Sequence, residues 1–229
     1  MSLLVCYGGT FDPVHNGHLA IARAARDALD ASVRLLPAAD PPHKDATHAD
    51  AAQRARMLEI AVAGEPGLKV DRRELGRDGP SYTVDTLRAL REEFGADRAI
   101  AWLVGADSLA ALDTWHAWRD LFSLAHLLVV RRAGDAPDAS WLAARSPTVA
   151  AEVSTRWRAA ADLAQASAGG LAVLPLAALR PESSTELRRR IRAGEPWRDW
   201  TAPAVAAYIE HRQLYGARGG DRATTPPPL

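Results

Sequence analysis

The chain has 229 residues, of which 48% are hydrophobic, so it is long enough to bury a sizeable core. Lys plus Arg and Asp plus Glu number 28 each, and this balance gives no reason to expect a nucleic-acid or membrane partner. The single cysteine, Cys6, excludes a disulfide framework within one chain and is predicted to be a small buried hydrophobe. Without a secretory leader or an apolar run of ~18 residues, the expected location is the cytoplasm.

Short apolar runs alternate with longer stretches of 3.6-residue period along most of the chain. This pattern predicts β and α units that feed a parallel sheet. The expected fold class is therefore α/β, a Rossmann-like doubly wound parallel sheet with C-terminal helices. The predicted strands are 3–7, 33–37, 68–71, 99–104, 127–131 and 171–174. The predicted helices are 17–29, 51–63 and 84–94, with two closing helices in SSTELRRRI and PAVAAYIEHRQLY.

Two regions of the chain lack a clear period. Residues 134–170 are predicted to form helices and loops at the edge of the sheet. Residues 216–229 are rich in Gly and Pro and should form a disordered tail. We therefore expect one domain over residues 1–215.

The stretch GGTFDPVHNGHL joins the first predicted strand to the first predicted helix. Gly8 and Gly9 allow the backbone to bend and to approach a ligand closely. The start of the helix offers unpaired N–H groups and a positive dipole end, which favour an anion such as phosphate. His15 and His18 are three residues apart and should project from the same side, where a triphosphate would favour their charged forms.

The same stretch is compatible with other kinds of site, which its residues favour less. A single histidine near a helix start is more often a polar surface residue or a half-buried ring than a ligand. Two histidines without a third protein ligand make a poor zinc centre, so no protein-held metal is predicted. The stretch has neither the Lys-Ser/Thr ending of a P-loop nor the G-x-G-x-x-G spacing of a dinucleotide fold. It predicts a phosphate site of a different kind.

Two motifs carry a resemblance to a known superfamily. GGTFDPVHNGHL resembles the T/H-x-G-H signature of nucleotidyltransferases, and SSTELR at 183–188 resembles their C-terminal S-S-T-x-x-R signature. Between them PPHK, PSYTVDTL, VGADSL and TWHAW form a set similar to the bacterial nicotinate-nucleotide adenylyltransferases. The resemblance implies transfer of the adenylyl group of ATP to nicotinate mononucleotide, which gives deamido-NAD and pyrophosphate in NAD biosynthesis.

The resemblance also implies roles for individual residues. His15, His18 and Arg188 would be catalytic and contact the ATP phosphates, with His18 at the α-phosphate. Mg²⁺ would arrive with ATP, and no protein nucleophile is implied. The other residues implied for ATP are Gly8, Gly9, Thr10, Phe11, Gly105, Asp107, Ser184 and Thr185. The residues implied for nicotinate mononucleotide are His43, Lys44, Thr83, Trp115, His116 and Arg132.

Some features fall outside these roles. Trp102, Trp118, Trp197 and Trp200 are assigned to packing. Glu182 stands where the family often has an apolar residue, just before the two serines.

Three alternatives to the nicotinate nucleotide stay open. The acceptor could be nicotinamide mononucleotide, or phosphopantetheine, for which SYTVDTL and TWHAW would have no use. The third is a non-catalytic nucleotide-binding module, which loss of either histidine or of Arg188 would have favoured. The sequence predicts no particular oligomeric state.

Overall fold

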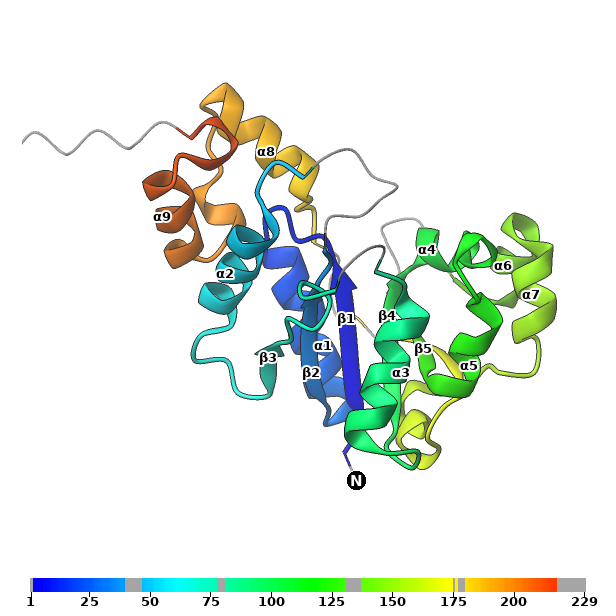
Figure 1. The fold of residues 1–229 in the computed structure, drawn as a ribbon. Helices are drawn as coiled ribbons and strands as arrows, with labels where there is room; N and C mark the ends of the chain where they lie inside the picture. Colours follow the sequence, from blue (N-terminus) through cyan, green and yellow to red (C-terminus); the bar gives the residue numbers. More distant parts are fainter. Residues whose placement is uncertain are drawn as a thin grey trace, which may run out of the picture.

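A computed structural model of the chain describes residues 2–39, 47–77, 81–130, 137–174, 176 and 180–217. Six strands form one sheet in the order β3-β2-β1-β4-β5-β6, and each pair of neighbours is parallel (Figure 1). Each predicted strand is present, with ends shifted by one or two residues, so the α/β prediction is confirmed. The strands are β1 (Leu4–Gly9), β2 (Ser32–Pro37), β3 (Leu68–Val70), β4 (Ile100–Gly105), β5 (His126–Val130) and β6 (Leu171–Val173).

Helices connect and cover these strands. The longer ones are α1 (Asn16–Leu29), α2 (Ala51–Val62), α3 (Thr83–Phe94), α8 (Ser184–Ala193) and α9 (Pro203–His211), all of them predicted. The shorter ones are α4 (Ala106–Ala110), α5 (Leu121–Leu124), α6 (Ala139–Arg145) and α7 (Pro147–Val153). Single 3₁₀ turns lie at Leu112–Thr114, Trp118–Asp120, Arg198–Trp200 and Leu214–Gly216, with a longer one at Ala160–Gln165. No helix within the described ranges is long and apolar enough to cross a membrane.

The sheet is buried on both faces, because successive side chains of a strand point to opposite sides. From β1 and the residue before it, Leu3 and Val5 join the core beneath α1, α2, α8 and α9. Leu4 and Cys6 join the core beneath α3 to α7. Burial raises the pKa of the Cys6 thiol to about 12, and the sulfur is therefore an inert part of the core, as predicted.

The four tryptophans assigned to packing do pack. Trp102, Trp118 and Trp197 are buried. Trp200 lies half-buried against the core, with the Arg190 guanidinium 4.2 Å from its ring centroid.

The strand order reverses at β1, which makes one end of the sheet the candidate ligand site. From β1 the chain passes through α1 to β2 on one side, and after β3 it crosses through α3 to β4 on the other side of β1. β1 ends at Gly9 and its neighbour β4 ends at Gly105. Open α/β sheets bind ligands outside the carboxyl ends of strands at such a reversal, and α8 approaches this end in Figure 1.

Candidate active site

The two glycines at the end of β1 lie against aromatic rings. A Cβ on Gly8 would come within 2.5 Å of the Trp102 ring, and one on Gly9 within 3.0 Å of the Phe11 ring. Phe11 is buried with a left-handed backbone, φ 51°, and the Asp12–Pro13 peptide bond that follows is cis. At position 8 a side chain would force the buried Trp102 ring to move, and at position 9 it would press on the Phe11 ring, so ring packing favours glycine at both positions independently of any ligand.

The two histidines stack on each other at the start of α1. Their ring centroids are 3.6 Å apart, and the edge of Phe11 meets His18 at 4.9 Å. The backbone N–H of His15 donates to Nδ1 of His18 at 3.2 Å. An Nδ1 that accepts a hydrogen bond carries no proton, so neutral His18 holds its hydrogen on Nε2. The predicted placement of both rings on one side is confirmed, and His18 becomes a donor of fixed tautomer.

Burial opposes charge on both rings. Burial lowers the pKa of His15 to about 4, against the pull of the Glu182 carboxylate, which favours the charged form. Burial and the neighbouring His15 hold the pKa of His18 well below its ordinary value. Both rings are neutral at neutral pH without ATP, so a triphosphate would have to overcome this burial before either ring became charged.

Replacing His15 by asparagine is expected to reduce the fall in the free energy of unfolding as the pH drops from 6.5 toward 4. The unfolded histidine titrates near 6.5 and the folded one near 4, so the stabilisation is present above pH 6.5 and disappears as the pH falls toward 4. At about pH 5 this difference costs the wild type about 2 kcal/mol that His15→Asn does not lose. Urea unfolding at about pH 7.5 and pH 5 measures it, with exposed His211→Asn as the control. The same pH dependence in wild type and His15→Asn would contradict the prediction.

The C-terminal motif docks directly on the loop after β1. Three successive carbonyl groups, those of residues 12–14, each accept a hydrogen bond, two of them from this motif and the third from Thr201, which lies between α8 and α9. Arg188 donates to the first at 2.6 Å, the Ser184 hydroxyl to the second at 2.9 Å, and the Thr201 hydroxyl to the third at 2.9 Å. The two sequence motifs, far apart in the chain, therefore form one structure at the carboxyl end of β1.

The start of α8 offers groups suited to an anion. Ser183 caps the helix, since its hydroxyl accepts the Glu186 N–H at 3.2 Å. Because the Ser184 hydroxyl hydrogen is directed to Pro13, Ser184 can donate to a phosphate only through its backbone N–H. Thr185 can donate through its backbone N–H as well as its hydroxyl, since the first helical turn leaves such N–H groups without internal acceptors. Within the described residues, Nε of Arg188 is buried without a hydrogen-bond partner.

Asp12 joins three parts of the chain, a role that the sequence analysis missed. Its buried carboxylate accepts the N–H groups of His48 at 2.9 Å and Ala49 at 3.2 Å, and the hydroxyl of Tyr215 at 2.8 Å. Burial and the Asp12 charge raise the pKa of Tyr215. The loop after β1 is thus fixed to the segment before α2 and to the C-terminal turn.

Arg54 is the second residue that the sequence analysis missed. It is fully buried in α2 and donates to the carbonyl oxygens of Thr10 and Ala38, both at 2.8 Å. These carbonyls follow the ends of β1 and β2. An arginine on the apolar side of a helix is unusual, and this signal in AAQRARMLEI could have identified it.

Gly105 and Asp107 lie at the end of β4, as predicted. Gly105 caps α4, and a Cβ built on it would meet no heavy atom of the described residues within 4 Å. Asp107 is in the first turn of α4. Their implied role with ATP stays a prediction.

Two segments predicted for the acceptor meet on the α3 side of the sheet. Thr83 begins α3, and the ring of the preceding residue, Tyr82, lies 4.4 Å from the ring of His116. Trp115 is half-buried against the core on this side. Tyr82 lies within the SYT motif, yet the sequence analysis did not single it out.

Three further residues predicted for the acceptor, His43, Lys44 and Arg132, lie outside the described residues, as does the part of the predicted tail from 218 onward. Within the described part of the chain, no group of three His, Cys, Asp or Glu side chains could hold a metal ion.

Comparisons with known proteins agree with the motifs. The sequence pattern of the cytidylyltransferase-like family matches residues 6–190. A probable nicotinate-nucleotide adenylyltransferase of Stenotrophomonas maltophilia is 50% identical over 94% of this chain and 97% of its own length. One of Laribacter hongkongensis is 50% identical over 91% of this chain and 92% of its own length.

A solved structure has the same fold. The nicotinic acid mononucleotide adenylyltransferase of Plasmodium falciparum, complexed with NaAD, superposes with a TM-score of 0.71 at 16% identity, over 94% of this chain and 98% of that one. From the family pattern and the curated relatives together, the chain belongs to the cytidylyltransferase-like family and, within it, to the nicotinate-nucleotide adenylyltransferases.

Proposed function

We propose that the chain transfers the adenylyl group of ATP to nicotinate mononucleotide, with deamido-NAD and pyrophosphate as products. The observation that carries this proposal is the docking of residues 183–188 on the loop after β1, where Arg188 binds the carbonyl of Asp12, three residues before the first of the two stacked histidines. The names of relatives that are 50% identical over nearly the whole chain support the choice of acceptor.

The chemistry is an in-line displacement at the α-phosphorus of ATP. A phosphate oxygen of the mononucleotide forms the new P–O bond, the bond to pyrophosphate breaks, and no covalent enzyme intermediate is required. Such reactions depend on positioning and on stabilisation of charge. His18, a neutral ring with Nε2–H as its donor, is assigned to an oxygen of the α-phosphate, and His15 holds it through the backbone hydrogen bond.

The other phosphates are assigned to the start of α8. The backbone N–H groups of Ser184 and Thr185 and the Arg188 guanidinium would hold the β- and γ-phosphates. Mg²⁺ would enter bound to ATP, because phosphate oxygens are the hard ligands that it prefers. Gly105 and Asp107, at the end of β4, are assigned to the adenosine.

The acceptor is assigned to the side of the sheet that carries α3. Trp115 would stack on the pyridine ring, and Thr83 and His116 would lie beside its carboxylate. His43, Lys44 and Arg132 remain candidates for its charged groups.

A coupled assay of pyrophosphate release tests the proposal. The purified chain is given MgATP with nicotinate mononucleotide, nicotinamide mononucleotide or phosphopantetheine. We expect rapid release with the first, slow release with the second and none with the third. No release with any acceptor, together with tight ATP binding, would favour a non-catalytic nucleotide-binding module.

Replacing Arg188 by alanine is expected to raise KM for ATP about tenfold or more, because its charge is felt in the ground and transition states alike. Steady-state kinetics with ATP as the varied substrate measures this. Arg189→Ala is the matched control, since that neighbour is half-exposed and pairs with Glu186 and Glu195. Unchanged ATP kinetics in Arg188→Ala would remove Arg188 from the site.

A further inference from the structure

Glu74 is a buried carboxyl group that none of the roles above uses. It follows β3 and is only 6% exposed. Burial raises the pKa of its carboxyl, against the hydrogen bond from Thr86 and the charge of Arg77. Burying such a group is unfavourable unless its hydrogen bonds are made, so its contacts are informative.

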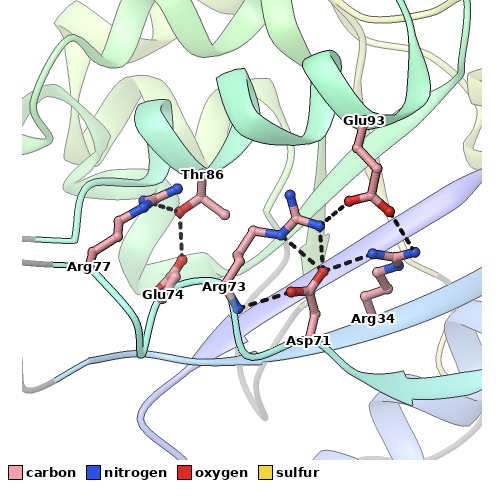
Figure 2. Close-up of polar contacts among 7 residues, drawn as sticks. All are labelled: Arg34, Asp71, Arg73, Glu74, Arg77, Thr86 and Glu93. Carbon is pink, nitrogen blue, oxygen red and sulfur yellow. Dashed lines mark hydrogen bonds and ion pairs between the residues drawn. The ribbon is translucent and has the colours of Figure 1, made fainter.

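The contacts of Glu74 lead to the first turns of α3 (Figure 2). The Thr86 hydroxyl donates to Oε1 of Glu74 at 2.9 Å and accepts from Arg77 at 2.8 Å. Thr86 is fully buried, so this hydroxyl is shielded from bulk water. Glu74 is therefore bonded to a helix residue three positions after Thr83, which is one helical turn away.

The segment after β3 that carries Glu74 is itself held by charged contacts (Figure 2). Asp71 accepts hydrogen bonds from Arg34 of β2 and from Arg73, each at 2.9 Å. Arg73 also pairs with Glu93, near the far end of α3. The segment that carries Glu74 is thus tied both to the sheet and to the end of α3 away from Thr83.

The start of α3 carries Thr83, one of the residues assigned to the acceptor. Thr83 is its first residue, and the ring of Tyr82 contacts His116. A tilt of this first turn would move both relative to Trp115. The Glu74–Thr86 hydrogen bond lies one turn behind Thr83, and its loss would remove a contact that opposes such a tilt.

We propose that Glu74 is a positioning residue for the acceptor, acting through Thr86 to set the start of α3 against the segment that carries Trp115 and His116. The proposal rests on the proposed function. It requires the effect to fall on the mononucleotide, because the histidine pair and α8 are held by separate contacts.

Steady-state kinetics of four variants test this role. Glu74→Ala and Thr86→Val should each raise KM for nicotinate mononucleotide about tenfold, with KM for ATP and kcat within about twofold of wild type. The double variant should be no worse than either single one, because both break the same bond. Glu74→Gln, whose amide oxygen still accepts from Thr86, should restore KM to within about threefold of wild type.

Glu92→Gln is the control for a general effect on α3, because Glu92 is exposed near the other end of the helix and lies outside the contacts described above for the Glu74 segment. We expect it to leave both KM values unchanged. Wild-type activity with nicotinate mononucleotide separates the two proposals. If the wild type is inactive with that acceptor, the proposed function is wrong. If it is active but Glu74→Ala and Thr86→Val have unchanged KM values, or raise both KM values equally, the positioning role alone is overturned.

Discussion

Alanine in place of His18 is expected to lower kcat by ~10² or more, with a smaller change in KM for ATP. The donor of His18 is held in place, since its Nδ1 accepts the His15 N–H, its ring stacks on His15 and the Phe11 ring packs against it in a T-shaped contact. A donor held in place before the reaction needs no reorganisation when charge develops on the α-phosphate. Single-turnover and steady-state rates with saturating MgATP measure the loss.

Two further substitutions at this position distinguish the donor from the scaffold. The side-chain amide of asparagine reaches about as far as Nδ1 and can still hold the His15 N–H, but it has nothing at the position of Nε2. The amide of glutamine reaches about as far as Nε2 and can donate there. We expect His18→Asn to be as slow as His18→Ala, and His18→Gln to recover part of the rate. A near-normal kcat in His18→Ala would remove the catalytic role.

Nicotinate mononucleotide is expected to exceed nicotinamide mononucleotide in kcat/KM by about a hundredfold or more. The two differ by a carboxylate in place of an amide. A pocket that offers only donors leaves the amide NH₂ unpaired, which costs about 1–3 kcal/mol, and charge-assisted bonds to the acid add to the difference. Initial rates with each acceptor at fixed MgATP measure the ratio, and equal efficiencies would contradict the nicotinate assignment while leaving adenylyl transfer intact.

Trp115→Ala provides the control within the same pocket. Stacking recognises the ring and not its substituent, so this change should weaken both acceptors in similar proportion and leave KM for ATP nearly unchanged. A Trp115→Ala defect confined to KM for ATP would show that Trp115 belongs to the ATP site and not to the acceptor site.

The sheet could be predicted from the sequence because strands buried on both faces are short continuous apolar runs, as IAWLVG and HLLVV illustrate. The short helices α4 and α5 could not, since a single turn has no period to detect. In the edge region from 137 to 170 the sequence predicted helices and loops but not their bounds. The reason is the same, because α6 and α7 have only seven residues each.

The candidate site was predictable where side chains form a motif and not where they bind the main chain. His15, His18 and Arg188 belong to recognisable signatures, and the structure stacks the two histidines on each other and binds Arg188 to the loop just before them. Arg54, by contrast, could be noticed only by its place on the apolar side of α2. Its acceptors, the carbonyl oxygens of Thr10 and Ala38, could not be predicted, because a carbonyl acceptor leaves no mark in a sequence. The direction of the Ser184 hydroxyl, toward Pro13, was hidden in the same way.

The docking of the C-terminal segment on the loop after β1 restricts the choice of amino acid on one side of the contact much more than on the other. On the loop side the acceptors are backbone carbonyls at residues 12–14, which any amino acid supplies as long as the chain keeps its path. On the other side a donor is needed at each of three positions, Ser184, Arg188 and Thr201. Serine and threonine can therefore exchange at two of these positions, whereas at Arg188 a shorter side chain would lose both the reach and the charge.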